Sequence, residues 1–210
     1  LAATAYPFGD YTLDAAYRKI GDGAFAGTKI ISLTVTNPNT EIGSYAFARC
    51  TALEQVILPE NGNVTIGAQA FRYAEKLTGV SGLAYVGRIG DYAFANAGLA
   101  SATIAAGADC GEGAFYSSKL EQVTIGAGAK FGFGAFQACA LLERVTMPEA
   151  GGVRFGVSCF SRDKNLRWID LSKTDGVIAD EAFYSCTALT VANLTNVTKI
   201  GNFAFANCAS

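Results

Sequence analysis

Glu121 and Glu143 are the residues of this chain that come nearest to a catalytic pair. They occupy matching positions in two adjacent copies of a repeat, so stacked copies would bring their carboxyl groups to about 5 Å, the spacing found in a retaining glycosidase. Lys119 and Arg144 stand close to them in the sequence, and nothing suggests the enclosed pocket that would shift a pKa. We therefore expect no enzyme and assign no catalytic residue, and a glycoside hydrolase remains only an alternative.

Histidine is absent from the chain. Its absence excludes Ser-His-Asp and Cys-His catalysis, histidine metal ligands and histidine-based pH switching together. The sequence also contains no Cys-x-x-Cys pair, so a zinc or redox motif has no support. We expect neither a metal nor a cofactor.

The six cysteines favour buried free thiols over disulfides. All of them occupy positions where the repeat holds a small or medium buried residue, and free Cys packs well in such places: Cys50, Cys110, Cys139, Cys159, Cys186 and Cys208. Cys186 and Cys208 fall one repeat apart, so their backbone separation permits a bridge, although their side chains should point the same way. That one bridge stays open.

Trp168 is the only tryptophan of the chain, and it stands among arginines. Strand alternation places it on the outward face with Asp170, next to Arg167, and one repeat away from Arg144. An exposed Trp beside Arg has the composition of a binding hot spot, and its flat ring can stack on a sugar or hold a guanidinium. The alternative is that Trp168 and Arg144 only pack on each other at the surface. Both interpretations remain open.

These side chains are positioned by a repeat with the pattern I-G-x-x-A-F-x-x-C-x-x-L-x-x-V-x-L. Residues 42–58 form one clear copy. A period in the low twenties is typical of a leucine-rich solenoid, in which each unit buries its apolar face only against its neighbours. The repeat is anchored by one phenylalanine per copy: Phe25, Phe47, Phe71, Phe94, Phe115, Phe136, Phe160, Phe183 and Phe205.

Each part of the repeat predicts a local structure. The L-x-x-V-x-L part alternates, so we expect one short strand per repeat and a parallel sheet with strands about 4.8 Å apart. The G-x-x-A-F part predicts a single helical or 3₁₀ turn. The Gly four residues before each Phe, replaced once by Ala179, indicates positive φ or close backbone approach. One outward column should hold Ser32, Gln55, Gly79, Ser101, Gln122, Arg144, Trp168 and Val191.

The repeat resembles that of the BspA-like leucine-rich repeat family of bacterial and protozoan surface proteins. The resemblance covers roughly residues 17–208. It implies an α/β leucine-rich-repeat solenoid, a right-handed superhelix with a parallel sheet on one face and short turns and loops on the other. It also implies a cell-surface or secreted adhesin that contacts matrix proteins, other microbes or glycans, and it brings no catalytic motif.

The unbroken repeat favours one domain. We expect an irregular capping segment over residues 1–16, with a turn at Tyr6–Asp10, and a solenoid of about nine repeats over 17–210. The last repeat lacks its strand, so its open edge invites end-to-end or edge contact. The net charge is −2 and 16% of residues are charged, which speaks against nucleic-acid binding. No apolar run reaches the ~18 residues that a membrane span needs.

The sequence therefore predicts a module for extracellular recognition or adhesion that binds a protein or a glycan through its sheet face. Trp168, Arg144, Arg167 and Asp170 form its expected site. The rival function is that of a structural spacer in a larger surface protein.

Overall fold

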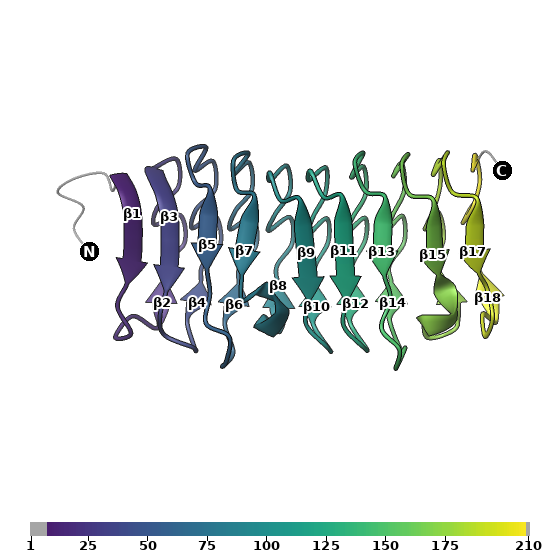
Figure 1. Cartoon of the computed structure of the whole chain (residues 1–210), viewed down its shortest axis with the longest axis horizontal. Helices are drawn as coiled ribbons and strands as arrows, with labels where there is room; N and C mark the ends of the chain where they lie inside the picture. The colour runs from purple at the N-terminus through teal and green to yellow at the C-terminus, as the bar shows by residue number, and fades with distance from the viewer. Residues whose placement is uncertain (1–7, 209–210) are drawn as a thin grey trace.

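The protein is a parallel β-solenoid, as the repeat predicted (Figure 1). The structure, a computed structural model, describes residues 8–208. Successive turns stack along the long axis, with β1 at one end of the stack and β17 and β18 at the other. Residues 8–208 contain almost no helix, only the 3₁₀ segments η1 (Leu83–Tyr85) and η2 (Leu171–Lys173).

The longer strands form one column, which splits into two sheets. The first sheet holds β1 (Phe8–Leu13), β3 (Lys29–Val35), β5 (Gln55–Ile57) and β7 (Gly79–Ser81). The second holds β9 (Ser101–Ile104), β11 (Gln122–Ile125), β13 (Arg144–Thr146), β15 (Trp168–Asp170) and β17 (Val191–Asn193). The outward column has the expected register within each sheet, including the pairs Ser32 with Gln55 and Arg144 with Trp168.

A second column of strands was missing from the expectation of one strand per repeat. Seven two-residue strands pair in parallel along another side: β2 (Lys19–Ile20), β4 (Glu41–Ile42), β6 (Thr65–Ile66), β8 (Arg88–Ile89), β10 (Asp109–Cys110), β12 (Lys130–Phe131) and β14 (Arg154–Phe155). The pair β16 (Val177–Ile178) and β18 (Lys199–Ile200) forms a further small sheet. Two residues are too few to show an alternating pattern, so hydrophobic periodicity could not predict these strands.

The interior is organised around the stacked phenylalanines. Neighbouring anchor rings lie 5.1–5.4 Å apart between centroids and are nearly parallel. Seven of them, from Phe47 to Phe183, are fully buried. Tyr11 of β1 packs on Phe25 at the first turn of the stack. The turn expected at Tyr6–Asp10 is therefore wrong for Phe8–Asp10, which begin a strand; Tyr6 and Pro7 lie outside the described residues.

The segment around each Phe is not the helical turn that was expected. Residues two before and two after the Phe adopt positive φ, as Tyr45 and Arg49 do at 58°. Their N–H groups donate to the next turn of the solenoid, to Ala68 O at 2.8 Å and Arg72 O at 2.7 Å. A helix would use these donors internally, so the stacking of turns selects tight, partly left-handed turns instead.

The glycines four residues before the Phe are explained by close approach alone. None of them has positive φ. A Cβ on Gly67 would lie 2.7 Å from Gly43 C of the preceding turn, whereas at Gly21 in the first turn it would meet nothing within 4 Å. Of the two reasons proposed, close backbone approach is confirmed and positive φ is wrong. Nothing in the structure explains why this repeat position can hold Ala179 in place of the glycine found in the other repeats.

All six cysteines are free thiols, as expected, and Cys186 and Cys208 are not bridged. Five are buried, and Cys208 in the last turn is half-buried. Four of them stand three residues after an anchor Phe, and each donates Sγ–H to the carbonyl of the anchor Phe in the previous turn. Cys50 donates to Phe25 O at 3.0 Å, and Cys139 donates to Phe115 O at 3.1 Å. Burial raises the pKa of every one of these thiols, so they are inert packing residues rather than reactive ones.

Candidate functional site

Trp168 and Arg144 face outward from adjacent strands of the second sheet. They are direct register partners between β15 and β13, and parallel strands lie about 4.8 Å apart. The next residue of β15, Ile169, is buried, so alternation turns Trp168 toward solvent. The Trp168 side chain is 47% exposed. The expected pair is thus brought together on the surface.

Arg167 and Asp170 differ from this pair in what surrounds them. Arg167 is exposed just before β15. Asp170 is half-buried, and its Oδ1 accepts hydrogen bonds from Ser172 N at 3.1 Å and Ser172 Oγ at 2.6 Å. That carboxylate caps η2 and fixes the chain leaving β15. The predicted site therefore consists of Trp168, Arg144 and Arg167 as outward groups, with Asp170 tied to its own loop.

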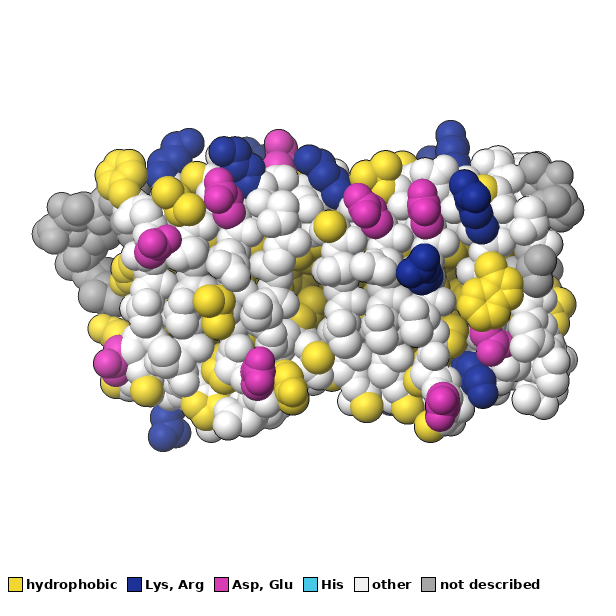
Figure 2. Space-filling model, viewed as in Figure 1, with side chains coloured by type: hydrophobic (Ala, Val, Ile, Leu, Met, Phe, Trp, Pro, Cys, Tyr) yellow, Lys and Arg dark blue, Asp and Glu magenta, His cyan; other side chains and the backbone are white. Residues whose placement is uncertain are grey.

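The charges of this patch are not neutralised by neighbouring side chains. The ion pairs found within residues 8–208 are Lys19 with Glu41 and Arg154 with Asp175. Arg144 and Arg167 take part in neither. Figure 2 shows the setting: much of the middle of this face is uncharged, and charged side chains gather toward its long edges. A partner would meet the arginines unpaired.

Glu121 and Glu143 lie one turn apart, as expected, with Glu143 N donating to Glu121 O at 2.9 Å. Both side chains are exposed. A carboxyl that works as a general acid is usually held in an apolar pocket. The surroundings of these two glutamates do not provide one, so they gain no support as a catalytic pair.

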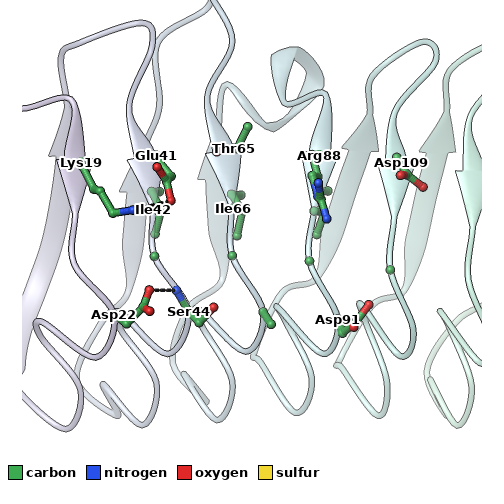
Figure 3. A pocket seen from close by; sticks show the side chains of 16 residues that line it. Lys19, Asp22, Glu41, Ile42, Ser44, Thr65, Ile66, Arg88, Asp91 and Asp109 are labelled. Carbon is green, nitrogen blue, oxygen red and sulfur yellow. Dashed lines mark hydrogen bonds and ion pairs between the residues drawn. The ribbon is translucent and has the colours of Figure 1, made fainter.

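A polar trough along the second column of strands was missed by the sequence reasoning (Figure 3). It has a volume of 620 Å³. Lys19, Glu41, Thr65, Arg88 and Asp109 rise on one side, and Asp22, Ser44 and Asp91 lie on the other. The glycines of three I-G pairs and of the Cys110-Gly111 pair form its floor: Gly43, Gly67, Gly90 and Gly111. The polar residue that precedes each of these I-G or C-G pairs was the signal that could have revealed it.

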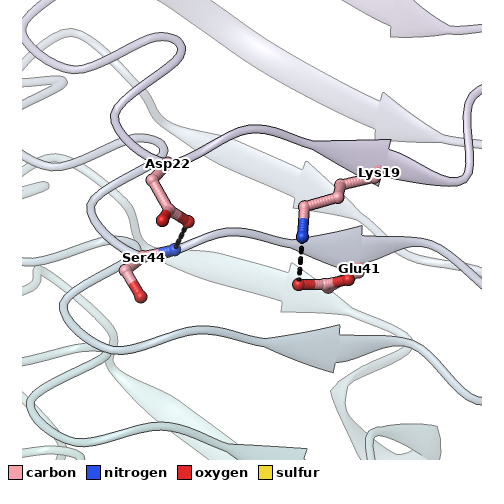
Figure 4. A network of polar contacts seen from close by, with 4 residues as sticks. All are labelled: Lys19, Asp22, Glu41 and Ser44. Carbon is pink, nitrogen blue, oxygen red and sulfur yellow. Dashed lines mark hydrogen bonds and ion pairs between the residues drawn. The ribbon is translucent and has the colours of Figure 1, made fainter.

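Interactions within the protein already account for much of this trough. Lys19 Nζ lies 2.8 Å from Glu41 Oε1, and Ser44 N donates to Asp22 Oδ1 at 2.8 Å (Figure 4). The hydrogen bond to Glu41 raises the pKa of Lys19. Because the glycine floor follows from backbone packing between turns, the trough by itself does not indicate a ligand.

No cluster of three or more His, Cys, Asp or Glu side chains within residues 8–208 is placed to hold a metal ion. In the same part of the chain no helix is long and apolar enough to cross a membrane.

Comparison with known families decides the relationship of the chain. The model of the BspA type leucine rich repeat region matches residues 8–100 and 108–210 with six copies. The chain belongs to this family. Membership is consistent with a protein-binding repeat module, and leucine-rich repeat proteins are in general not enzymes. A search of curated proteins gives no match.

Solved structures of other leucine-rich repeat proteins share the fold. A protein from Bacteroides ovatus aligns with a TM-score of 0.60 and 20% identity, over 94% of this chain and 63% of its own. The chain thus spans less than two thirds of that protein's length. TpLRR of T. pallidum aligns with a TM-score of 0.66 and 24% identity, over 75% of this chain and 77% of its own. At these identities the likeness shows the fold alone.

Proposed function

We propose that this chain is a non-enzymatic recognition module that binds an extracellular protein through the outward face of its second sheet. The observation that carries the proposal is the register pair of Arg144 and Trp168, with the Trp168 ring 47% exposed. Trp and Arg are enriched among the few interface residues that supply most of the binding free energy. Arg167 adds a second exposed cation beside the ring.

The face is suited to recognition in other ways. Its strands are fixed by hydrogen bonds to both neighbouring turns, so little ordering entropy is lost on binding. Most other outward residues of this sheet are small and polar, such as Ser101, Thr103 and Thr124. A partner that contacts Trp168 can therefore approach the backbone closely over β9 and β11. The family resemblance places such modules at the cell surface or in secreted proteins, and we extend that location to this chain.

The rival proposal from a different class is a structural spacer. The many outward Thr residues support it, because β-branched residues suit exposed strand positions without any ligand. A spacer gives no reason for Trp168 and Arg144 to share one register position on the surface. A glycan as the partner of this patch, and a glycoside hydrolase built on Glu121 and Glu143, are weaker alternatives.

A binding panel separates these proposals. The chain is passed over immobilised fibronectin, laminin, fibrinogen and collagen, and Trp168→Ala and Ile57→Ala are run in parallel. Ile57 is a matched control, since it is 40% exposed on the outward face of the first sheet. We expect at least one partner whose affinity falls about tenfold or more in Trp168→Ala and is kept in Ile57→Ala. Absence of binding to the whole panel favours the spacer.

A further inference from the structure

Three tyrosines stand in a backbone conformation that bulky side chains rarely adopt. Tyr45, Tyr73 and Tyr92 have φ of 58°, 60° and 54°. They lie in three consecutive repeats, two residues before or after the anchor Phe. The first repeat holds Gly23 and Gly27 at these places. Every repeat has positive φ at these two places, so the conformation itself belongs to the repeat. A bulky side chain makes that conformation costly, so its presence there needs a separate reason.

Burial does not explain these tyrosines. The Tyr45 side chain is 47% exposed, and those of Tyr73 and Tyr92 are only half-buried. The interior of the same repeats is filled by Phe47, Phe71 and Phe94, which need no help from them. The tyrosines therefore form a surface feature, which we name the tyrosine ledge: Tyr45, Tyr73 and Tyr92 with Gln69 and Arg72.

The ledge is held rigid by its own contacts. Gln69 Nε2 donates to Tyr45 Oη at 2.7 Å, and Arg72 donates to Gln69 Oε1 at 2.6 Å. The Arg72 guanidinium lies 4.9 Å from the Tyr73 ring centroid and 5.9 Å from that of Tyr92. Tyr92 Oη donates to the Glu112 carboxylate, and this bond raises the pKa of Tyr92 to about 12. Such preorganisation lowers the entropy cost of binding.

A small pocket opens beside the ledge, between two charges of opposite sign. It has a volume of 260 Å³ and is lined by Arg49, Thr51, Tyr73 and Glu75. The Arg49 guanidinium lies 5.7 Å from the Tyr73 ring centroid. Neither Arg49 nor Glu75 takes part in the ion pairs found within residues 8–208. The Arg49 guanidinium, a hydrogen-bond donor, and the Glu75 carboxylate, an acceptor, thus line the same pocket as the Tyr73 ring without forming an ion pair with each other.

We propose that this pocket binds one ring of a neutral glycan. A sugar hydroxyl both accepts and donates hydrogen bonds, so vicinal hydroxyls can accept from Arg49 and donate to Glu75. The apolar C–H groups of the sugar pack against Tyr73, and the Thr51 hydroxyl offers a further polar contact. A charged sugar gains no net attraction here, because one of Arg49 and Glu75 attracts it and the other repels it. The site is built from the turns around the Phe residues, so it stands apart from the sheet-face proposal.

Calorimetric titration with neutral oligosaccharides tests this site. Cellohexaose, laminarihexaose, chitohexaose and mannohexaose are each added up to about 10 mM, because a single sugar subsite binds weakly. The key variant is Tyr73→Gly, which removes the ring and relieves the positive-φ strain, so it folds at least as well. Phe203→Gly is the matched control, since it makes the same backbone change at an exposed aromatic residue of the last turn that does not line the pocket.

We expect at least one neutral hexasaccharide to bind, with affinity reduced about tenfold or more in both Tyr73→Gly and Glu75→Gln and kept in Phe203→Gly. Three results would overturn the proposal. The first is that no neutral probe binds. The second is that Tyr73→Gly binds as the parent chain does. The third is that an oligogalacturonate binds more tightly than every neutral probe.

Discussion

The two sheets of the long-strand column share their interior and differ on their outward face. The inward residues are apolar in both, such as Leu33 and Val56 in the first sheet and Val123 and Ile169 in the second. Outward, the first sheet presents Ser32, Gln55 and Gly79, while the second presents Ser101, Gln122, Arg144 and Trp168. Inward positions are fixed by the neighbouring turns, and outward positions are free to vary. Recognition by these sheets therefore has to be sought in the outward differences.

Because the interior is shared, removing an anchor Phe should lower the free energy of unfolding by the same large amount in either half. Phe71→Ala and Phe115→Ala each remove a fully buried ring that stacks on two others. We expect each to lower the free energy of unfolding by about 3–5 kcal/mol, measured by urea denaturation. A loss confined to one half would show that the two halves of the stack are not equivalent.

Replacing a glycine four residues before the Phe should have a smaller effect on stability. The effect should appear only where a preceding turn packs against that glycine. Gly67→Ala places a Cβ within 2.7 Å of the backbone at Gly43 and Ser44, whereas Gly21→Ala meets open space. We expect the Gly67 variant to lose about 1–3 kcal/mol of stability and the Gly21 variant to change by less than about 0.5 kcal/mol. Equal thermal midpoints for the two variants would contradict this explanation of the glycines.

One buried acid distinguishes the C-terminal half. Asp163 is fully buried three residues after Phe160, where four other repeats hold Cys. Its Oδ1 accepts from Cys139 N at 2.8 Å, and its Oδ2 has no hydrogen-bond partner among the described residues. Burial raises the pKa of Asp163 well above its ordinary value, opposed only in part by the Cys139 N–H. The buried carboxyl therefore lowers the stability of the turn that leads to Trp168.

Replacing that acid should stabilise the protein. In Asp163→Cys the thiol can donate to the Phe136 carbonyl, as the other Cys residues of the column do, and the unpartnered oxygen disappears. We expect a gain of about 1–3 kcal/mol at neutral pH, measured by urea denaturation with reductant present. Unchanged or lower stability would show that the Asp163 carboxyl is satisfied in its place.

The pH dependence of that gain has a defined sign. Because the folded state raises the pKa of Asp163, its contribution to stability is complete below the unfolded pKa and is lost as pH rises from about 4. The gap between Asp163→Cys and the parent chain should therefore widen as pH increases. A gap that narrows over that range would rule out a raised pKa.

The outward residues predict the smallest effect on stability. Trp168→Ala and Ile57→Ala remove half-exposed side chains from corresponding faces of the two sheets. Each should shift the free energy of unfolding by less than about 0.5 kcal/mol. A large loss in Trp168→Ala alone would mean that the ring packs structurally on Arg144, as the alternative interpretation holds.

The sequence predicted the features that repeat strongly and missed those that do not. The Phe column, the parallel register and the pairing of Arg144 with Trp168 followed from a period repeated nine times. The two-residue strands were too short to show periodicity. The positive φ of Tyr45 and Arg49 arises from hydrogen bonds between turns, which no local pattern records. The capping role of Asp170 depends on the turn after β15, which the strand pattern did not describe.

Trp168 is the only tryptophan, so its fluorescence reports directly on the proposed recognition face. The most direct measurement is its emission, with acrylamide quenching, as the matrix protein selected by the panel is added. Binding at this face should shift the emission to the blue and protect the ring from acrylamide, because the exposed indole becomes covered. Unchanged emission and quenching in a complex whose formation is shown by interferometry would place the binding surface elsewhere on the solenoid.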